Sequence, residues 1–509
     1  MPLRLVFVLG ALAAVPAPEP GRLTREPFVL ETRDGKALIR AELFRLAVPE
    51  NRARASGGVA EIAFVRLPST AAGPAPPIVW LAGGPGDAGT DDMKGPLSGL
   101  FLAMREHGDV IVLDQRGTGL SRPRLDCPGA FDLPLEEPSG RDKVLAAMER
   151  LARECRGFWE ARGVDLSAYN VNEMADDVED VRTALGAEKI TLVGASFGTQ
   201  VALATIRRHE RSVHRAVLLG AVGPDHALAL PSNVQSHLVE MGRLARRDRK
   251  LSRLIPDFLG LMGRVLHRLE ASPVSVEVSD PRTKRNVTVT VGREDLEYFT
   301  RRLLYSRPIL EALPAFYEAM SRGNFLGLAT VSLLSRRGQA PSAVRFLVGC
   351  SSGASPERLR RIESEKRGTI LGAMLDFPVP DVCPAWGISD LGDGFRAPIR
   401  SEVPLLVVSG SLDVHTPAGN GEEVLAGFPN GFHLVTEGAT HFCLGLGGKT
   451  RKVLSRFLRG EPVRSARFMA PPLKFRLPRG TESDRWASRG LRGARPSSAP
   501  AWEPEGRNY

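Results

Sequence analysis

Residues 189–206 (KITLVGASFGTQVALATI) decide the fold of this chain. The apolar run 189–193 predicts a buried β-strand, and residues 199–206 have the pattern of a helix. Between them stands G-x-S-x-G, with Ser196 at its centre and flanking glycines that allow a tight turn and close helix packing. Such an elbow lifts a serine hydroxyl clear of a sheet, at a helix N-terminus that favours developing negative charge. The pattern predicts a nucleophile; a chance match in a glycine-rich chain is the alternative.

A nucleophilic serine needs a base and a group that orients the base, and two downstream segments supply candidates. Asp413 follows the apolar run 404–408, and His441 follows the run 432–435, so both should lie in loops after strands. Loops at the carboxyl ends of parallel strands meet at one edge of an open α/β sheet. We therefore expect Ser196, Asp413 and His441 to form a catalytic triad.

Each of these assignments has a competitor. Asp413 could instead cap the turn at residues 416–417. His415 is a weaker candidate for the base because it follows Asp413 too closely, and His433 lies within a strand, which favours a structural role.

A glycine loop after a further expected strand can supply amides for the oxyanion. Residues 78–81 (IVWL) predict the strand, and residues 82–86 (AGGPG) follow it. Acyl transfer requires two N–H groups aimed at the tetrahedral oxygen. We expect them from Phe197, directly after the nucleophile, and from Gly84, since Pro85 has no N–H.

The same loop matches a motif of a different class of protein. Residues 84–89 (GPGDAG) fit the dinucleotide fingerprint G-x-G-x-x-G, and Asp114 ends the run 110–113 where a ribose-binding acid belongs. A dinucleotide loop opens directly into a helix, whereas residues 95–96 (GP) interrupt this one. A nucleotide-binding oxidoreductase is thus an alternative, but it leaves the candidate triad unexplained.

Several segments together resemble a known family, the prolyl aminopeptidase group of α/β-hydrolases, and most of all its secreted, tripeptidyl-aminopeptidase-like branch. The resemblance extends from about residue 60 to residue 457. It is carried by the triad segments and by residues 82–86 (AGGPG), 114–121 (DQRGTGLS), 164–170 (VDLSAYN), 176–182 (DDVEDVR) and 194–199 (GASFGT). It implies a serine peptidase without a cofactor that removes residues from the N-termini of small peptides.

Two positions depart from the family pattern. Phe197 stands where the family often has tyrosine, and Ala82 where it often has histidine or another polar residue. Both could alter the pocket, so the mechanism carries over more securely than the substrate. Arg116, within DQRGTG, is expected to pair internally rather than to act in catalysis.

The order of the expected elements predicts an α/β-hydrolase fold, with a mostly parallel central sheet flanked by helices. The sheet strand at 215–219 and the strand that begins at 404 are separated by far more residues than a crossover helix needs. This insertion should be a large, mainly helical lid before the strand that precedes Asp413. Within it we expect helices over 254–269, with a proline in the first turn, and 293–304, and a hairpin from 274–278 and 286–291.

These elements divide the chain into five parts. They are a signal peptide (1–17), the first part of the hydrolase core (28–222), the lid (223–395), the second part of the core (396–460) and a basic tail rich in Pro and Arg, partly disordered (461–509). The alternative for the first part is a buried strand or an uncleaved anchor, although its apolar stretch is short for a membrane span. The tail holds ten Arg or Lys against five Asp or Glu. We expect it to be solvated, with no nucleic-acid partner, since no aromatic residues interleave with the basic ones. Contact of this basic tail with an anionic envelope surface or with nucleic acid is the alternative.

Five cysteines agree with export from the cytoplasm. The family resemblance implies disulfides between Cys127 and Cys155 and between Cys350 and Cys383, although spacing alone leaves the connectivity open. Cys443 is left over and should be a small buried residue. No C-x-x-C or H-E-x-x-H occurs, which gives a metal site little support.

Together the motifs predict a secreted or periplasmic serine hydrolase, and the family resemblance implies an exopeptidase acting on peptide N-termini. An esterase or lipase would use the same machinery, and a catalytically inactive binding protein is the third possibility. An aminopeptidase also needs a carboxylate for the free α-amine of the substrate. The lid offers five candidates without a choice among them: Glu294, Asp295, Glu297, Glu311 and Glu318.

Overall fold

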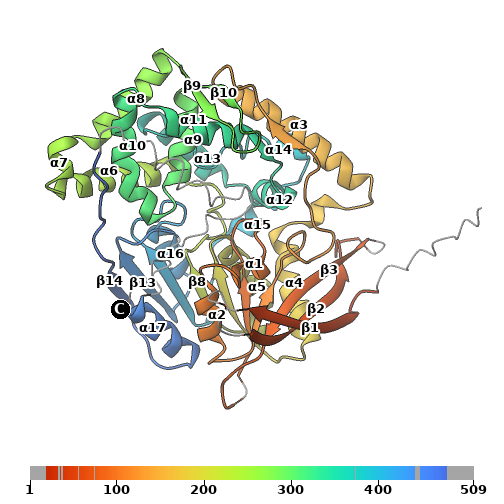
Figure 1. Cartoon of the computed structure of the whole chain (residues 1–509). Helices are drawn as coiled ribbons and strands as arrows, with labels where there is room; N and C mark the ends of the chain where they lie inside the picture. The colour runs from red at the N-terminus through yellow and green to blue at the C-terminus, as the bar shows by residue number, and fades with distance from the viewer. Residues whose placement is uncertain are drawn as a thin grey trace, which may run out of the picture.

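The computed structural model describes residues 19–31, 35, 38–54, 57–73, 75–372, 374–441 and 447–478. In this part of the chain a ten-stranded sheet runs in the order β1-β2-β3-β5-β4-β7-β8-β12-β13-β14 (Figure 1). From β5 to β14 neighbouring strands are parallel, and β1, β2 and β3 add an antiparallel edge. The strands are β1 (Leu23–Glu31), β2 (Leu38–Pro49), β3 (Val59–Leu67), β4 (Ile78–Leu81), β5 (Val110–Leu113), β7 (Ile190–Ala195), β8 (Val213–Leu219), β12 (Leu405–Gly410), β13 (Gly431–Glu437) and β14 (Ala466–Met469). The sheet confirms the predicted fold class.

Helices cover both faces of this sheet, which explains why its central strands are mostly apolar. In β4, Val79 and Leu81 belong to one apolar cluster, whereas Ile78 and Trp80 belong to another, because successive side chains point to opposite faces. The first cluster includes side chains of α3 (Arg141–Glu160), α4 (Val171–Ala184), α5 (Phe197–His209) and α16 (Ala418–Leu425). The second includes side chains of α2 (Ser98–Met104) and α17 (Gly448–Leu458).

The lid has an apolar core of its own and forms the upper layer in Figure 1. Its elements are α6 (Pro231–Arg247), α7 (Leu251–Leu254), α8 (Phe258–Ala271), the antiparallel hairpin of β9 (Val274–Ser279) and β10 (Asn286–Val291), α9 (Arg293–Leu303), α10 (Arg307–Ser321) and α11 (Leu326–Arg336). The helix predicted from residue 254 begins only at Phe258. Asp257 caps α8 by accepting a hydrogen bond from the amide of Gly260, and the proline at 256 falls in the break after α7 instead of inside a helix.

Two helices in the second half of the insertion, α12 (Ala343–Ser352) and α14 (Cys383–Trp386), pack against the hydrolase core rather than the lid. This half also contains α13 (Pro356–Glu365) and α15 (Gly392–Arg396), and the apolar side chains of α12 and α14 belong to the core cluster. A disulfide between Cys350 and Cys383 joins α12 to α14. The strand β11 (Arg337–Gln339), directly before α12, pairs with β6 (Ala130–Asp132).

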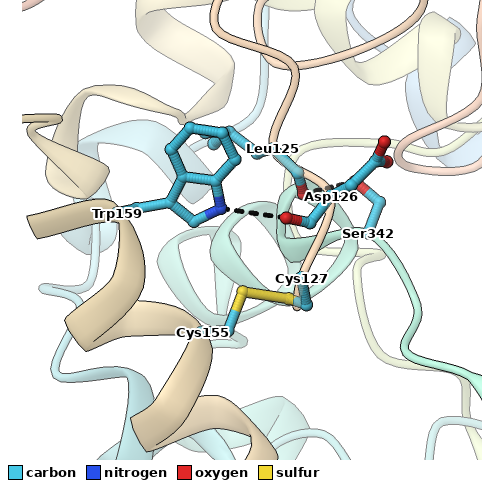
Figure 2. Close-up of a disulfide and its surroundings, with 6 residues drawn as sticks. All are labelled: Leu125, Asp126, Cys127, Cys155, Trp159 and Ser342. Carbon is cyan, nitrogen blue, oxygen red and sulfur yellow. Dashed lines mark hydrogen bonds between the residues drawn. A yellow bond between two sulfur atoms is a disulfide. The ribbon is translucent and has the colours of Figure 1, made fainter. Parts of the chain in front are cut away.

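A second disulfide lies where α12 begins. It joins Cys127 to Cys155 of α3, as Figure 2 shows. Next to it, the Leu125 carbonyl accepts hydrogen bonds from the Ser342 hydroxyl (3.3 Å) and the Ala343 amide (2.9 Å). The start of α12 is therefore tied to the core segment that carries this disulfide.

Both ends of the core extend beyond the predicted boundaries. The sheet begins at Leu23, before residue 28, and β14 pairs with β13 from within the predicted tail, where its short sequence (ARFM) carries little apolar pattern. The predicted signal peptide, residues 479–509 of the tail and Cys443 lie outside the described residues. Among the helices that are described, none has the length and apolar character required to cross a membrane.

Candidate active site

Ser196 lies at the turn between β7 and α5, in an uncommon backbone conformation. Its φ is 52° and its ψ is −121°, an uncommon conformation for a non-glycine residue. A Cβ added at Gly194 would lie 2.5 Å from the carbonyl oxygen of Gly198, and one added at Gly198 would lie 2.1 Å from that of Leu81. Both glycines of G-x-S-x-G are thus required by the closeness of strand and helix.

The structure brings Ser196, His441 and Asp413 into one hydrogen-bonded chain. Nε2 of His441 lies 3.1 Å from Oγ of Ser196, and its Nδ1 lies 2.8 Å from Oδ2 of Asp413. Asp413 follows β12 and His441 follows β13, which are neighbouring parallel strands. The three residues therefore meet at the carboxyl edge of the sheet in the arrangement of a serine nucleophile, its base and its orienting acid.

Asp413 also caps the turn that follows it, the role that the sequence offered as an alternative to catalysis. Its Oδ1 accepts hydrogen bonds from the amides of His415 (3.0 Å) and Thr416 (2.9 Å), while the Thr416 hydroxyl donates to Oδ2 (2.6 Å). Burial alone would raise the pKa of Asp413, but His441 and these hydrogen bonds outweigh it, so the pKa is lowered. The carboxylate stays ionised and fixed in orientation.

The predicted oxyanion amides belong to two segments next to Ser196. Phe197 is the first residue of α5, and in the glycine loop a Cβ added at Gly83 would lie 3.4 Å from Cβ of Ser196. Within the described part of the chain, neither the Phe197 amide nor the Gly84 amide donates a hydrogen bond. Both remain available for a ligand oxygen.

The lid contributes a wall of aromatic rings next to the base. Tyr305, between α9 and α10, stacks on His415 with ring centroids 3.6 Å apart and lies edge-on to His441 at 5.6 Å. Burial and the neighbouring His441 hold the pKa of His415 well below 6.5, and burial lowers the pKa of His237, on α6, to about 4. Two neutral imidazoles thus lie near the triad without competing for its carboxylate. Sequence reasoning set His415 aside as a base and did not single out the other two residues.

His433, an alternative to His441 as the base, and Asp114, the candidate ribose-binding acid, have structural roles. His433 in β13 pairs through Nε2 with the Ser409 hydroxyl (2.9 Å). Asp114, the candidate ribose acid, accepts hydrogen bonds from the amide and hydroxyl of Thr90 and from the Leu120 amide, each at 2.8 Å. The helix after the glycine loop, α1 (Gly89–Asp92), is a single turn. These features do not fit a dinucleotide site.

Arg116 forms the internal pair expected for the DQRGTG segment. It is fully buried and donates to both carboxylate oxygens of Asp177, at 2.8 and 2.6 Å. No cluster of three or more metal-ligating side chains occurs among the residues with described structure.

All five lid carboxylates proposed for a substrate amine already have partners. They are Glu294 with the Arg141 amide, Asp295 with Arg336 (2.7 Å), Glu297 with Arg293 (2.8 Å), Glu311 with Arg307 (3.3 Å) and Glu318 with Arg322 (2.8 Å). Four of these carboxylates are therefore compensated by arginines of the insertion, and Glu294 is held by a backbone amide of α3.

A different carboxylate, Asp87, lies in the glycine loop and was not among those candidates. It forms no hydrogen bond or ion pair with any described residue. A Cβ added at Gly84 would lie 3.4 Å from its Cγ, and its charge also acts on Tyr305. Burial raises the pKa of Asp87, while Arg345 acts in the opposite direction. The motif G-x-G-x-x-G specifies the glycines of this loop and gives no signal for Asp87.

Several known proteins are similar to this chain in sequence or in structure. Serine protease Hip1 from Mycobacterium tuberculosis (strain ATCC 25618 / H37Rv) is 30% identical over 188 residues, which are 36% of each chain. Tripeptidyl aminopeptidase from Streptomyces lividans is 29% identical over 157 residues, 29% of this chain and 28% of that protein. The matches thus span about a third of these relatives. The solved structure of proline iminopeptidase from Mycobacterium smegmatis is 18% identical, covers 82% of this chain and 98% of its own, and has a TM-score of 0.37.

The family comparison covers more of the chain than these pairwise matches. Residues 76–447 match the family described as the alpha/beta hydrolase fold, a span that includes Ser196, Asp413 and His441. The chain belongs to the alpha/beta hydrolase fold family.

Proposed function

We propose that the protein is a serine hydrolase that cleaves peptides and releases residues or short peptides from their N-termini. The observation that carries this proposal is the hydrogen-bonded chain of Ser196, His441 and Asp413, at 3.1 and 2.8 Å. Oγ of Ser196 attacks the scissile carbonyl while Nε2 of His441 takes its proton, and Asp413 stabilises the imidazolium. His441 then protonates the leaving amine, and water hydrolyses the acyl-enzyme with the same base.

The developing oxyanion is stabilised by the amides of Phe197 and Gly84, which have no other acceptor among the described residues. This mechanism uses only groups of the protein and requires no cofactor.

Two observations support a peptide chain end as the substrate. Relatives of this chain are named serine protease and tripeptidyl aminopeptidase. The lid extends to the triad, where Tyr305 lies edge-on to His441, and such a cover favours a chain end over the middle of a folded chain.

We assign Asp87 as the group that holds the α-ammonium of the substrate. Its carboxylate is in the loop beside the nucleophile, is exposed, and forms no hydrogen bond or ion pair with a described residue. The surrounding protein raises its pKa, and Arg345 opposes this rise. An ammonium ion bound there would stabilise the charged carboxylate. The five lid acids are less suited because each has a partner already.

The two disulfides support a secreted or periplasmic location, since such bonds persist in oxidising compartments.

The test has three parts, which address the nucleophile, the free N-terminus of the substrate and the role of Asp87. Ser196→Ala should abolish labelling by a fluorophosphonate probe while circular dichroism is unchanged, and labelling that persists would reject the nucleophile. N-acetylation of a good peptide substrate should lower kcat/KM by about 30-fold or more, the lower end expected for losing a desolvated charge pair. Asp87→Asn should remove this difference, whereas Asp142→Asn, at an exposed position on α3, should keep it. Equal cleavage of free and acetylated peptides, or cleavage of esters only, would replace the exopeptidase proposal with an esterase.

A further inference from the structure

After the last sheet strand the chain crosses from the hydrolase core to the lid. From β14 it runs up to the lid layer (Figure 1), and we call residues 470–476 the strap. The Ala470 amide donates to the carbonyl of Glu437 at 2.8 Å, and a Cβ added at Gly438 would lie 3.7 Å from Cβ of Ala470. Glu437 ends β13, and Gly438 begins the loop that carries His441. The strap therefore starts beside the loop of the proposed base.

The other end of the strap is bonded to α10. The carboxylate of Glu311 accepts a hydrogen bond from the Lys474 amide at 2.9 Å, and the Glu311 carbonyl accepts one from the Arg476 amide at 2.8 Å. Between these contacts, Leu473 and Phe475 pack against the apolar cluster of the lid. Backbone amides and apolar side chains of the strap thus both hold it to the lid.

Arg307, the first residue of α10, joins the lid, the strap and the loop of the proposed base. Its guanidinium donates to the carboxylate of Glu311 (3.3 Å), to the carbonyl of Pro472 and to the carbonyl of Gly438 (3.5 Å). The side chains of Arg307 and Glu311 are 18% and 17% exposed, so water screens their pairing little. The planar fork of a guanidinium can serve several acceptors at once, which makes Arg307 the junction of three segments.

This junction is adjacent to the lid residue that faces the triad. Tyr305 stands two residues before Arg307, stacks on His415 with ring centroids 3.6 Å apart and lies edge-on to His441 at 5.6 Å. With only Ser306 between them, the position of Arg307 fixes where the Tyr305 ring can lie.

The loop of the proposed base has anchors of its own. The Gly438 amide donates to the Ser411 hydroxyl at 2.9 Å, and the Leu412 amide donates to the Ala439 carbonyl at 2.8 Å. The contact from Arg307 to Gly438 is longer than either. Loss of the junction should therefore release the lid wall rather than the base.

We propose that Arg307 is a positioning residue that, together with the strap, fixes Tyr305 over the proposed base and so determines how well substrates large enough to reach the lid are bound. Arg307 acts through Tyr305 rather than on the reacting atoms. The inference rests on the proposed triad chemistry but does not require the substrate to be a peptide.

The first experiment compares substrates of two sizes in the full chain. The values of kcat/KM are measured for 4-nitrophenyl acetate and octanoate, and for the coumarin amides of alanine and of a tripeptide. In Arg307→Gln the ratio of the large to the small substrate should fall about tenfold or more, mainly through KM, which is the loss expected for one charge-assisted hydrogen bond. Arg307→Lys should restore only part of the ratio, because an ammonium does not reproduce the fork.

The matched control for this experiment lies at the other end of α10. Arg322→Gln breaks a similar ion pair, with Glu318 at 2.8 Å, and should keep the ratio of the wild type. An unchanged ratio in Arg307→Gln, or an equal fall in Arg322→Gln, would overturn the proposal.

The second experiment tests the strap itself. Lys474→Pro removes the amide that donates to Glu311, whereas Lys474→Ala keeps this amide and is the matched control. The proline variant should lower the ratio as Arg307→Gln does, and the alanine variant should not. Combining Arg307→Gln with Lys474→Pro should lower the ratio little further, because both changes act on one junction. Losses that multiply in full would show independent effects and would reject the strap.

The two substrate series separate this inference from the proposed peptidase function. If the coumarin amides are not cleaved but the ester ratio falls in Arg307→Gln, the exopeptidase proposal is rejected and the strap is supported. If the amides are cleaved and neither ratio falls, the strap is rejected and the peptidase function is supported.

Discussion

Replacing Asp413 by asparagine should disable the base by reversing the tautomer of His441. Oδ1 of Asp413 accepts two backbone N–H groups, from His415 and Thr416, and these can only donate. The asparagine oxygen must therefore take the Oδ1 position, which turns its NH₂ group toward Nδ1 of His441. Nδ1 then has to accept, so the proton of the neutral ring moves to Nε2 and points at Ser196.

In that state Nε2 cannot take the serine proton, and kcat should fall by about 10,000-fold. The assay is the rate of hydrolysis of a fluorogenic peptide or ester, together with the rate at which a fluorophosphonate labels Ser196. Circular dichroism and the melting temperature serve as controls for folding. An Asp413→Asn variant within tenfold of the wild-type kcat would refute this reading of the hydrogen bonds.

Three further predictions concern stability. Burial raises the pKa of Asp92 to about 7 from an ordinary 3.8, so the folded state binds a proton that the unfolded chain releases, and the free energy of unfolding should fall as pH rises from 4 to 7. In chemical denaturation, Asp92→Asn should be up to about 4 kcal/mol more stable than wild type at pH 8 and almost equal to it at pH 4, and an equal gain at both pH values would contradict this. Removing the Cys127–Cys155 disulfide by a double serine substitution should lower the free energy of unfolding by about 3 kcal/mol, because it closes a loop with a sequence separation of 28; a loss below about 1 kcal/mol would speak against this. Gly198→Ala should destabilise the fold by about 3 kcal/mol or more, because its Cβ would lie 2.1 Å from a backbone oxygen, whereas Gly157→Ala in α3, which meets nothing within 4 Å, should be neutral or stabilising; equal melting temperatures for the two variants would be the contrary result.

The elements around the triad could be predicted because their signals are local. Ser196, Asp413 and His441 each follow a short buried run, and the parallel sheet brings the carboxyl ends of such runs together whatever lies between them. The fold class follows from the same runs and is confirmed. The start of α8 differed because the proline before Asp257 and the cap at Asp257 together set a boundary that apolar periodicity does not show.

The features that complete the site depend on contacts between distant segments. Arg345 is near the glycine loop only because α12 packs against the core, and the sequence placed α12 inside the lid. The sequence does not show which lid carboxylates are paired, so all five were candidates for binding the substrate amine. The structure shows their partners, such as Arg336 for Asp295. Strand β14 has four residues with little pattern, so its pairing with β13 is fixed by tertiary context.

The division of the insertion between two apolar clusters sets where chimeras with related hydrolases can be joined. The segment 223–341 contributes most of the separate cluster of α6 to α11, whereas α12 and α14 supply buried side chains such as Val344 and Trp386 to the core. Exchange of the whole insertion up to residue 395 would remove both cysteines of the Cys350–Cys383 disulfide and the side chains of α12 and α14 that pack in the core. Exchange of only residues 223–341 would replace the helices over the site and would keep α12, with its disulfide to α14, in this chain.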